Sequence, residues 1–410
     1  MLTANNNAKR VAYPEALKAI MSVEKATESR AWLSQWSGIN KGSTPLYILP
    51  SLATTLGVGQ IWIKDESQRS KLGSFKALGA PIALVRLILR VFPDQNFDPI
   101  ELLRGAYRDA LADFTVISAT DGNHGRGLAA AAQSIGCRCV IVLHANVSVE
   151  REVAIAEYGA EIVRITGNYD ESVEEAAALA EKNNWLVVSD TSYDGYEEIP
   201  RDVMQGYGTI AAEILEQTQH ARAGEQPFTH VFLQGGVGGL AAGIASYFCE
   251  VFGKDRPAMI MVEPEQADCL YQSAVAGEAA KTQGSVDSVM AGLACGETSP
   301  LAWKFLKESV DYFMTIKDED AVAAMRILAV GEGKDIPLVS GESAVAGLAG
   351  LIAIMQSPSL AADVGLDQNS RILFISTEGA TAPNVYKELV GDSAEVVLDR
   401  QAKWIEANRR

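Results

Sequence analysis

The sequence predicts an α/β protein made of two doubly wound, mainly parallel-sheet domains. Between residues 114 and 190, short apolar runs alternate with longer helical stretches three times. A second strand-and-helix series follows from residue 230. Nearly all-apolar strands joined by helices are typical of parallel sheets that are covered on both faces. With 410 residues, the chain is long enough for two domains of this kind.

The first series is defined by its apolar runs and by glycines that stop helices. Strands are predicted at 114–120, 139–144, 161–166 and 185–190. Helices are predicted at 124–136, 149–160 and 170–184, the first two with a glycine at or near the end. This regular alternation predicts a parallel sheet for this part of the chain.

The second series surrounds the first in the sequence. Strands are predicted at 61–66, 230–234, 259–264 and 371–377, and a helix at 241–252. The polar, glycine-containing stretch 265–298 is predicted to be a mobile loop. The expected division is a large domain formed by 1–85 and 200–410, and a small domain formed by 86–199. Ligands of such folds bind beyond the carboxyl ends of the strands, so motifs at those ends are the candidates for a site.

Composition narrows the class of protein. Apolar residues make up 48% and charged residues 21% of the chain, and no apolar run approaches the roughly 18 residues that span a bilayer. The N-terminus lacks the apolar segment of a signal peptide, so we expect a cytoplasmic protein without membrane partners. A net charge of −17 argues against nucleic-acid binding. The four histidines show no metal-ligand spacing, so no metal site is expected.

The first motif is IWIKDESQRSKLGSFKALGA, at 61–80. Ser74 is placed to cap a following helix, which would put Lys76 in its first turn. A lysine there is unfavourable because the helix dipole is positive at that end. Lys76 is therefore either a solvated surface lysine or a Schiff-base lysine whose amine has a lowered pKa.

The second motif is SATDGNHGRGLA, at 118–129, between a strand and a helix. Gly122 and Gly125 would let the backbone approach a flat ligand closely. Asn123 can donate to an anionic oxygen, and Asp121 places a carboxylate at the same edge. The alternative is an ordinary strand-to-helix turn in which Asp and Asn are turn formers.

The third motif is the glycine-rich loop between the strand at 230–234 and the next helix. Its backbone N–H groups and the positive end of the helix dipole make a cradle for a phosphate. The residues of this cradle are Gly235, Gly236, Val237, Gly238, Gly239 and Leu240. The run from Gly236 to Ala241 also fits a dinucleotide fingerprint, with Glu263 as the acidic residue after the next strand. A nicotinamide-dependent oxidoreductase is therefore an alternative, although it leaves Lys76 unexplained.

The three motifs together, in this order, resemble fold-type II pyridoxal-phosphate (PLP) enzymes such as tryptophan synthase β, threonine dehydratase and cysteine synthase. The resemblance implies PLP in the cleft between two domains, a Schiff base at Lys76 and a hydrogen bond from Asn123 to the phenolic oxygen. It implies phosphate binding by the loop from Gly235 to Leu240. A hydroxyl in FISTEGAT (374–381), from Thr377 or alternatively Ser376, would meet the pyridine nitrogen. A mobile small domain and a homodimer are also implied.

Six separated segments, spread from about Thr44 to Tyr386, narrow the resemblance to the diaminopropionate ammonia-lyases. These segments are KDESQRSKLGSFKALG, ATDGNHGRGLA, SDTSYDGYEEIPRDVMQGYGT, GLACGE, VSGESA and FISTEGAT. The implied reaction is PLP-dependent α,β-elimination of L- and D-2,3-diaminopropionate to pyruvate and two ammonia molecules. Lys76 and Asp121 would be the two bases, and Asp121 and Asp190 are the candidates for a carboxylate near the β-amine.

Other interpretations stay open at this stage. A serine/threonine dehydratase would use the same cofactor, but a hydroxyl leaving group gains little from Asp121. A non-catalytic relative that senses a ligand is a further alternative, against which the retained Lys76 argues. His124 and Asp190 could each be a capping or packing residue. Cys269 and Cys295 flank a polar stretch and could pair as a disulfide.

Overall fold

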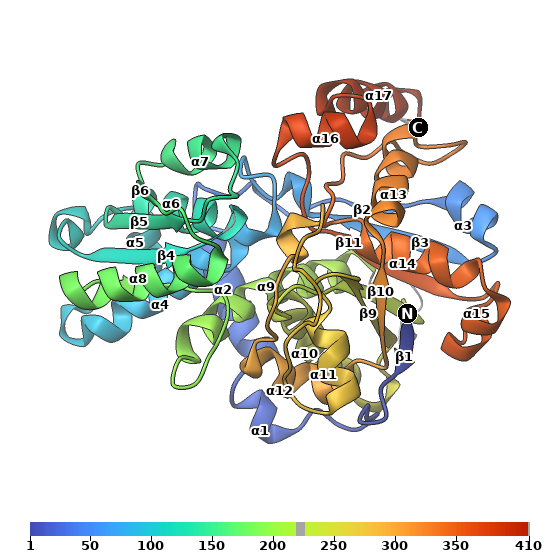
Figure 1. The fold of residues 1–410 in the computed structure, drawn as a ribbon, viewed down its shortest axis with the longest axis horizontal. Helices are drawn as coiled ribbons and strands as arrows, with labels where there is room; N and C mark the ends of the chain where they lie inside the picture. Colours follow the sequence, from blue (N-terminus) through green and yellow to red (C-terminus); the bar gives the residue numbers. More distant parts are fainter. Residues whose placement is uncertain (121, 219–225, 409–410) are drawn as a thin grey trace. The chain divides into compact units, whose positions relative to one another are not determined.

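A computed structural model describes residues 1–120, 122–218 and 226–408 of the chain (Figure 1). The chain forms two compact units. The first unit comprises Met1–Ser22, Ser43–Gln68 and Ile210–Arg410, and the second comprises Val23–Gly42 and Arg69–Thr209. Each unit is described by itself below.

The first unit contains a seven-stranded sheet in the order β1-β10-β9-β8-β11-β3-β2. Its strands are β1 (Leu2–Ala4), β2 (Leu46–Ile48), β3 (Gln60–Asp65), β8 (His230–Gln234), β9 (Ala258–Pro264), β10 (Tyr312–Ile316) and β11 (Arg371–Ser376). The five inner strands are parallel, and β1 and β2 are antiparallel at the two edges. The inner strands are nearly all buried because helices cover them, as the apolar sequence of these runs predicts.

The helices of the first unit lie on this sheet and along its edges. They are α1 (Glu15–Lys18), α3 (Pro50–Leu56), α10 (Gly239–Phe252), α11 (Cys269–Ala276), α12 (Pro300–Ser309), α13 (Asp318–Val330), α14 (Ala346–Met355), α15 (Pro358–Val364), α16 (Pro383–Val390) and α17 (Ala394–Ala407). The apolar helix α14 packs on β8, β9, β10 and β11 in the main core. Gly347 of α14 has no room for a Cβ atom, which would lie 3.1 Å from the side chain of Phe232.

The second unit contains a four-stranded parallel sheet in the order β6-β5-β4-β7. Its elements are α2 (Val23–Leu33), α4 (Ala80–Val91), α5 (Pro99–Leu103), β4 (Thr115–Ala119), α6 (Asn123–Ile135), β5 (Arg138–Leu143), α7 (Val149–Ala156), β6 (Glu161–Arg164), α8 (Tyr169–Asn183), β7 (Leu186–Val187) and the first part of α9 (Glu198–Thr218). Alternate residues of β4 and β5 face α8, while Gly125 of α6 packs against Ile141 from the other side. The sheet is therefore covered on both faces, as predicted (Figure 1).

The predicted fold class is confirmed, and most predicted elements occur within a few residues of their expected bounds. The stretch 265–298 is the main exception, because α11 lies within it and the prediction of a loop throughout is wrong there. The predicted domains, 1–85 with 200–410 and 86–199, stay a prediction. The two compact units have other bounds than the predicted domains. The helices α2 and α4 pack against α5 and α6 in the second unit, whereas α2 and the start of α4 were predicted in the large domain.

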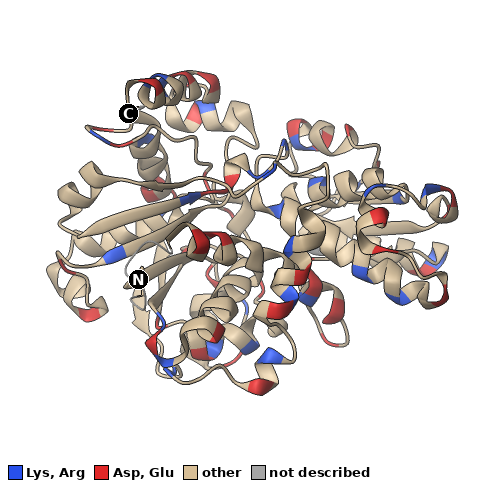
Figure 2. Cartoon of the chain, turned by 180° about the vertical axis from the view of Figure 1, so that it is seen from behind, with Lys and Arg blue, Asp and Glu red and all other residues tan. Residues whose placement is uncertain are grey.

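Charged residues of both signs occur in each unit. Figure 2 shows Asp and Glu interspersed with Lys and Arg on the helices and loops of each unit. Among the described residues, no single helix is long and apolar enough to cross a membrane. The bent pair α14 and α15 passes that test jointly by length and composition, but α14 is a buried core helix.

Candidate active site

Both sheets have a point at which the strand order reverses, and the sequence motifs lie there. In the first unit the reversal falls between β8 and β11; the glycine loop follows β8, and Thr377 follows β11. In the second unit it falls between β4 and β7; Asn123 follows β4, and Asp190 follows β7. Such reversals open a crevice at the carboxyl ends of the strands, where ligands of doubly wound sheets bind.

Lys76 lies in a single 3₁₀ turn, Phe75–Leu78, and the helix α4 begins only at Ala80. Lys76 therefore lies in the first turn of a short 3₁₀ helix with Ser74 at its N-cap position, whereas the expected capping by the Ser74 side chain is wrong. The Ser74 side chain makes no capping hydrogen bond, and its hydroxyl is buried without a hydrogen-bond partner among the described residues. Neighbouring helices approach this turn closely.

Two glycines in those helices allow this close approach. A Cβ atom on Gly127 of α6 would lie 3.0 Å from the carbonyl oxygen of Lys76. A Cβ atom on Gly206 of α9 would lie 2.1 Å from the carbonyl oxygen of Leu78, a distance that no packed structure tolerates. The two helices thus contact the backbone of the turn directly and fix the position of Lys76.

The side chain of Lys76 contacts the carboxylate of Asp190 within the second unit. Burial raises the pKa of the Asp190 carboxyl, but Lys76 and then His124 lower it by more, and the net effect holds this pKa below the ordinary 3.8. A neighbouring carboxylate stabilises the ammonium form of lysine. The residue pairing itself was not predictable, because 114 positions separate the two side chains.

Asp190 is held in place by groups that bind the backbone just before it. The Tyr196 hydroxyl accepts from the Ser189 N–H and donates to the Val187 carbonyl, both at 2.9 Å. His124 Nε2 lies 2.9 Å from the Val188 carbonyl, so this nitrogen carries the proton, and Nδ1 lies 3.9 Å from the Asp190 carboxylate. His124 therefore contributes to the electrostatics of the site besides packing.

The turn after β4 contains the motif residues Asp121 and Asn123. Asp121 lies outside the described residues. Asn123 is the first residue of α6 and is partly exposed. Thr120, which the sequence analysis did not single out, accepts hydrogen bonds from the N–H groups of Gly122 and Gly125, each at 3.2 Å. The Gly122 φ of 154° and the hydroxyl of Thr120 together shape this turn.

The glycine loop fits an anionic group. It leads from β8 into the N-terminus of α10, whose first N–H groups have no intrahelical acceptor. Gly238 has a left-handed φ of 99°, and its Cβ would lie 2.9 Å from Leu306. A Cβ on Gly236 would lie 3.1 Å from the Gly292 carbonyl. Side chains are thereby excluded at Gly236 and Gly238. The Gly235 N–H donates to the Val262 carbonyl at 2.9 Å, so an anionic group would be bound by the N–H groups that follow it at the start of α10.

Two hydroxyls end the neighbouring strand β11. Ser376 Oγ lies 2.8 Å from Ser340 Oγ, and both side chains are buried. Thr377 Oγ1 accepts from Gln234 Nε2 at 3.2 Å. The nearby turn with Ser343 also contacts this region, since Ser343 Oγ accepts from the Gly292 N–H at 2.9 Å.

Glu263 does not have the role that the dinucleotide alternative requires. Its side chain is fully buried, and its two carboxylate oxygens accept from the N–H groups of Leu270 and Tyr271 at the start of α11. Burial raises its pKa well above 4.5. A carboxylate that caps a helix in this way is not available to bind a ribose, which argues against the oxidoreductase.

All five cysteines are free thiols in the structure. Cys269 Sγ lies 3.5 Å from the Gly236 carbonyl, and Cys295 also lies against Gly236, because a Cβ atom there would come within 3.2 Å of its sulfur. The two thiols therefore flank the glycine loop without a disulfide. Among the described residues, no group of three or more His, Cys, Asp or Glu side chains could hold a metal ion.

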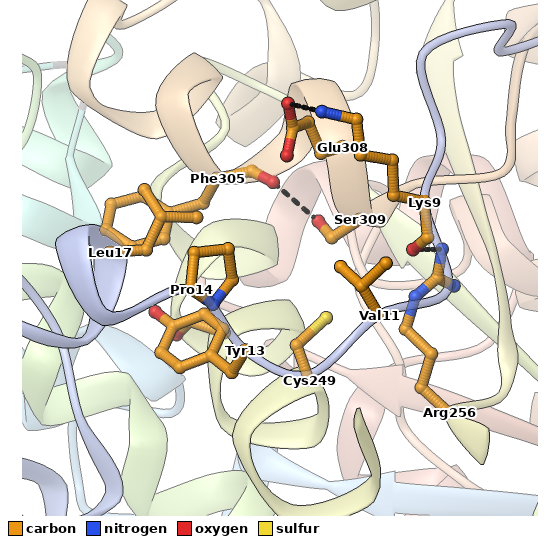
Figure 3. Close-up of a pocket in the computed structure, with 11 residues that line it drawn as sticks. Lys9, Val11, Tyr13, Pro14, Leu17, Cys249, Arg256, Phe305, Glu308 and Ser309 are labelled. Atoms are coloured by element: carbon orange, nitrogen blue, oxygen red, sulfur yellow. Dashed lines mark hydrogen bonds and ion pairs between the residues drawn. The ribbon is translucent and has the colours of Figure 1, made fainter. Parts of the chain in front are cut away.

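A separate pocket lies in the first unit, under the N-terminal segment (Figure 3). Its lining includes Tyr13, Cys249 of α10 and Phe305 of α12. Cys249 lies near the C-terminal end of α10, whereas the glycine loop lies at the N-terminal end, so this pocket is not the candidate phosphate site.

Comparisons with known proteins agree with this geometry. A family model described as pyridoxal-phosphate dependent enzyme matches residues 39–378. Diaminopropionate ammonia-lyase of Escherichia coli (strain K12) is 39% identical over 358 residues, which are 86% of this chain and 88% of that protein. The Salmonella typhimurium enzyme is 38% identical over 359 residues, with the same shares of both chains.

Solved structures give the same result. The holo diaminopropionate ammonia lyase from Escherichia coli matches with a TM-score of 0.86 at 36% identity, covering 95% of this chain and 96% of that chain. A structure of the same enzyme in complex with D-serine has equal scores and coverage. Threonine deaminase isoform 2 from Solanum lycopersicum, at 22% identity and a TM-score of 0.70, shares the fold. The chain therefore belongs to the PLP-dependent enzymes and, within them, to the diaminopropionate ammonia-lyases.

Proposed function

We propose that this enzyme converts 2,3-diaminopropionate into pyruvate and two molecules of ammonia, and that it accepts both the L and the D enantiomer. The observation that carries the proposal is the contact between Lys76 and Asp190 at the strand reversal of the second unit. A lysine paired with a carboxylate provides both an amine for PLP and a negative charge for a substrate with two amines. The 39% identity to the Escherichia coli enzyme supports the same substrate class.

The cofactor-binding roles follow from the residues of each unit. In the first unit, the N–H groups from Gly236 to Leu240 would hold the phosphate, and Thr377 would meet the ring nitrogen. The Gly235 N–H, which was also expected to bind the phosphate, donates instead to the Val262 carbonyl at 2.9 Å. In the second unit, Lys76 Nζ would hold PLP covalently, and Asn123 would donate to its phenolic oxygen. Bound PLP supplies an electron-withdrawing ring that acidifies the Cα–H of an attached amino acid.

The remaining roles concern the two substrate amines and the Cα proton. Lys76 would take the Cα proton of the L enantiomer, and Asp121 that of the D enantiomer, because the two protons lie on opposite faces. Asp190, partly exposed at 21%, would bind the β-ammonium group and keep it oriented for departure. The three-carbon product then takes up water, which yields pyruvate and the second ammonia.

The proposal extends to the cellular form of the enzyme. We propose a cytoplasmic homodimer whose smaller domain moves when substrate binds, with no nucleic-acid or membrane partner. The resemblance to fold-type II enzymes supports the dimer and the movement, and the net charge of −17 supports the absence of nucleic acid.

The division of labour is tested by pyruvate release from the separate enantiomers. Asp121→Asn should abolish activity on the D form, a loss of at least about 100-fold as expected for a missing general base, and should spare most activity on the L form. Asp190→Asn should raise KM for diaminopropionate more than KM for L-serine, which lacks the second amine and serves as a matched control substrate. Equal losses on both enantiomers, or equal KM increases for both substrates, contradict these roles.

A further inference from the structure

Gln234 is the last residue of β8 and directly precedes the glycine loop of the first unit. Its side chain is buried, and its amide nitrogen Nε2 has three oxygen neighbours within the same unit. These are the Ile375 carbonyl at 2.8 Å, the Ala344 carbonyl at 3.2 Å and Thr377 Oγ1 at 3.2 Å. The amide thus links the ends of β8 and β11, the two strands between which the strand order reverses.

The neighbours of Gln234 fix the orientation of its amide. Two of them are backbone carbonyls, which only accept hydrogen bonds. A reversed amide would place its own carbonyl oxygen against the oxygens of Ile375 and Ala344, so the N–H side must face them. The same N–H side then faces the hydroxyl of Thr377, with at least one amide proton shared between two acceptors.

This orientation determines what the Thr377 hydroxyl does. Its oxygen accepts from Gln234, so its single proton remains available for another acceptor. A pyridine nitrogen without a proton is an acceptor with one lone pair, whereas a protonated ring nitrogen would need an acceptor instead. Ser376 lacks such a directing partner, because its neighbour is the hydroxyl of Ser340 and either oxygen can be the donor.

We propose that Gln234 is a positioning residue that keeps Thr377 as a hydrogen-bond donor toward the ring nitrogen of PLP. This inference rests on the proposed role of Thr377. The amide oxygen of Gln234 supports the inference, because Oε1 is buried without a hydrogen-bond partner among the described residues. An unsatisfied buried acceptor is unfavourable for folding, so the residue is not explained by stability alone.

The test is a double-mutant cycle on cofactor binding. The cofactor-resolved enzyme is titrated with PLP, and affinity and absorption spectrum are recorded for the wild type, Gln234→Met, Thr377→Val and the double variant. Each single variant should bind PLP about 5–10-fold more weakly, the value of one hydrogen bond. In the Thr377→Val background, Gln234→Met should weaken PLP binding by less than about a further twofold, because Gln234 acts through Thr377.

A matched control separates this role from general damage to the fold. Gln401 is another buried glutamine of the first unit, and its Nε2 donates to the Pro337 carbonyl at 2.9 Å. Gln401→Met should leave PLP affinity unchanged, although both variants remove hydrogen bonds to buried carbonyls and should lower the melting temperature of the PLP-free protein. The proposal is overturned if Gln234→Met leaves affinity and spectrum unchanged, if Thr377→Val does so, or if the two effects simply add. No substrate is needed, so a failure of the proposed reaction would appear separately in pyruvate release.

Discussion

Replacing Lys64 with methionine removes a fully buried cation from the first unit and tests the energetics of its network. Lys64 Nζ donates to the Thr44 carbonyl at 2.8 Å, to Glu213 Oε2 at 2.7 Å and to Gln217 Oε1 at 2.9 Å. The side chains of Lys64 and Glu213 are 0% and 3% exposed. All three ammonium protons are therefore satisfied, and Glu213 has its counter-ion away from water.

The expected cost of Lys64→Met is about 3–5 kcal/mol, because it removes the ammonium group that lies 2.7 Å from the buried Glu213 carboxylate. For a folding unit of this size that corresponds to a fall of roughly 6–20 °C in melting temperature. The double variant Lys64→Met/Glu213→Met removes both charges together with the hydrogen bond from the Thr44 N–H to Glu213, at a cost of about 1–3 kcal/mol. It should therefore be more stable than the single variant.

Thermal unfolding followed by circular dichroism provides the assay. The exposed pair Lys9 and Glu308 serves as a control, since Lys9→Met should cost less than about 1 kcal/mol. The reasoning is refuted if Lys64→Met melts like the wild type, or if the double variant is less stable than Lys64→Met.

Two further predictions concern a buried acid and a glycine contact. Burial raises the pKa of Glu263 in the folded protein well above its ordinary 4.5. The stability that the protonated side chain contributes is therefore fully present below about pH 4.5 and is lost as pH rises through the pKa of the folded state. The melting temperature of Glu263→Gln relative to wild type should therefore rise between about pH 5 and pH 8; a constant difference contradicts this sign. Gly206→Ala should displace the turn carrying Lys76 and weaken PLP binding at least about tenfold, a shift typical of an overpacked contact. Gly296→Ala, whose Cβ would meet Val286 at an ordinary 3.4 Å, should not weaken binding, and equal behaviour of the two variants contradicts the account.

The sequence predicts the central strands well because they are apolar on both faces. The runs that became β4, β5, β8 and β9 are distinguishable from helices by their length and β-branched residues. The short edge strands β1 and β2 were not predicted, since three residues carry no periodicity. The helix α11 was also missed. Its N-terminal N–H groups are bound by Glu263, seven and eight positions earlier, and the residue directly before the helix, Asp268, makes no capping hydrogen bond.

In the candidate site, features formed by consecutive residues could be predicted from the sequence, and contacts between distant segments could not. The glycine loop is readable from sequence because its chemistry lies in consecutive residues. The contact of Lys76 with Asp190, and the close approach of Gly206 to Leu78, depend on how separate helices and strands pack. Nor does the sequence around Gln234 indicate that its amide would face Thr377, 143 positions further along the chain.

The most direct test of the account is pyruvate release by the purified enzyme supplied with PLP. We expect kcat/KM for at least one enantiomer of 2,3-diaminopropionate to exceed that for L-serine and L-threonine by at least about 100-fold, as expected where a carboxylate selects a second amine. Activity confined to serine or threonine would contradict the substrate assignment and the proposed roles of Asp121 and Asp190.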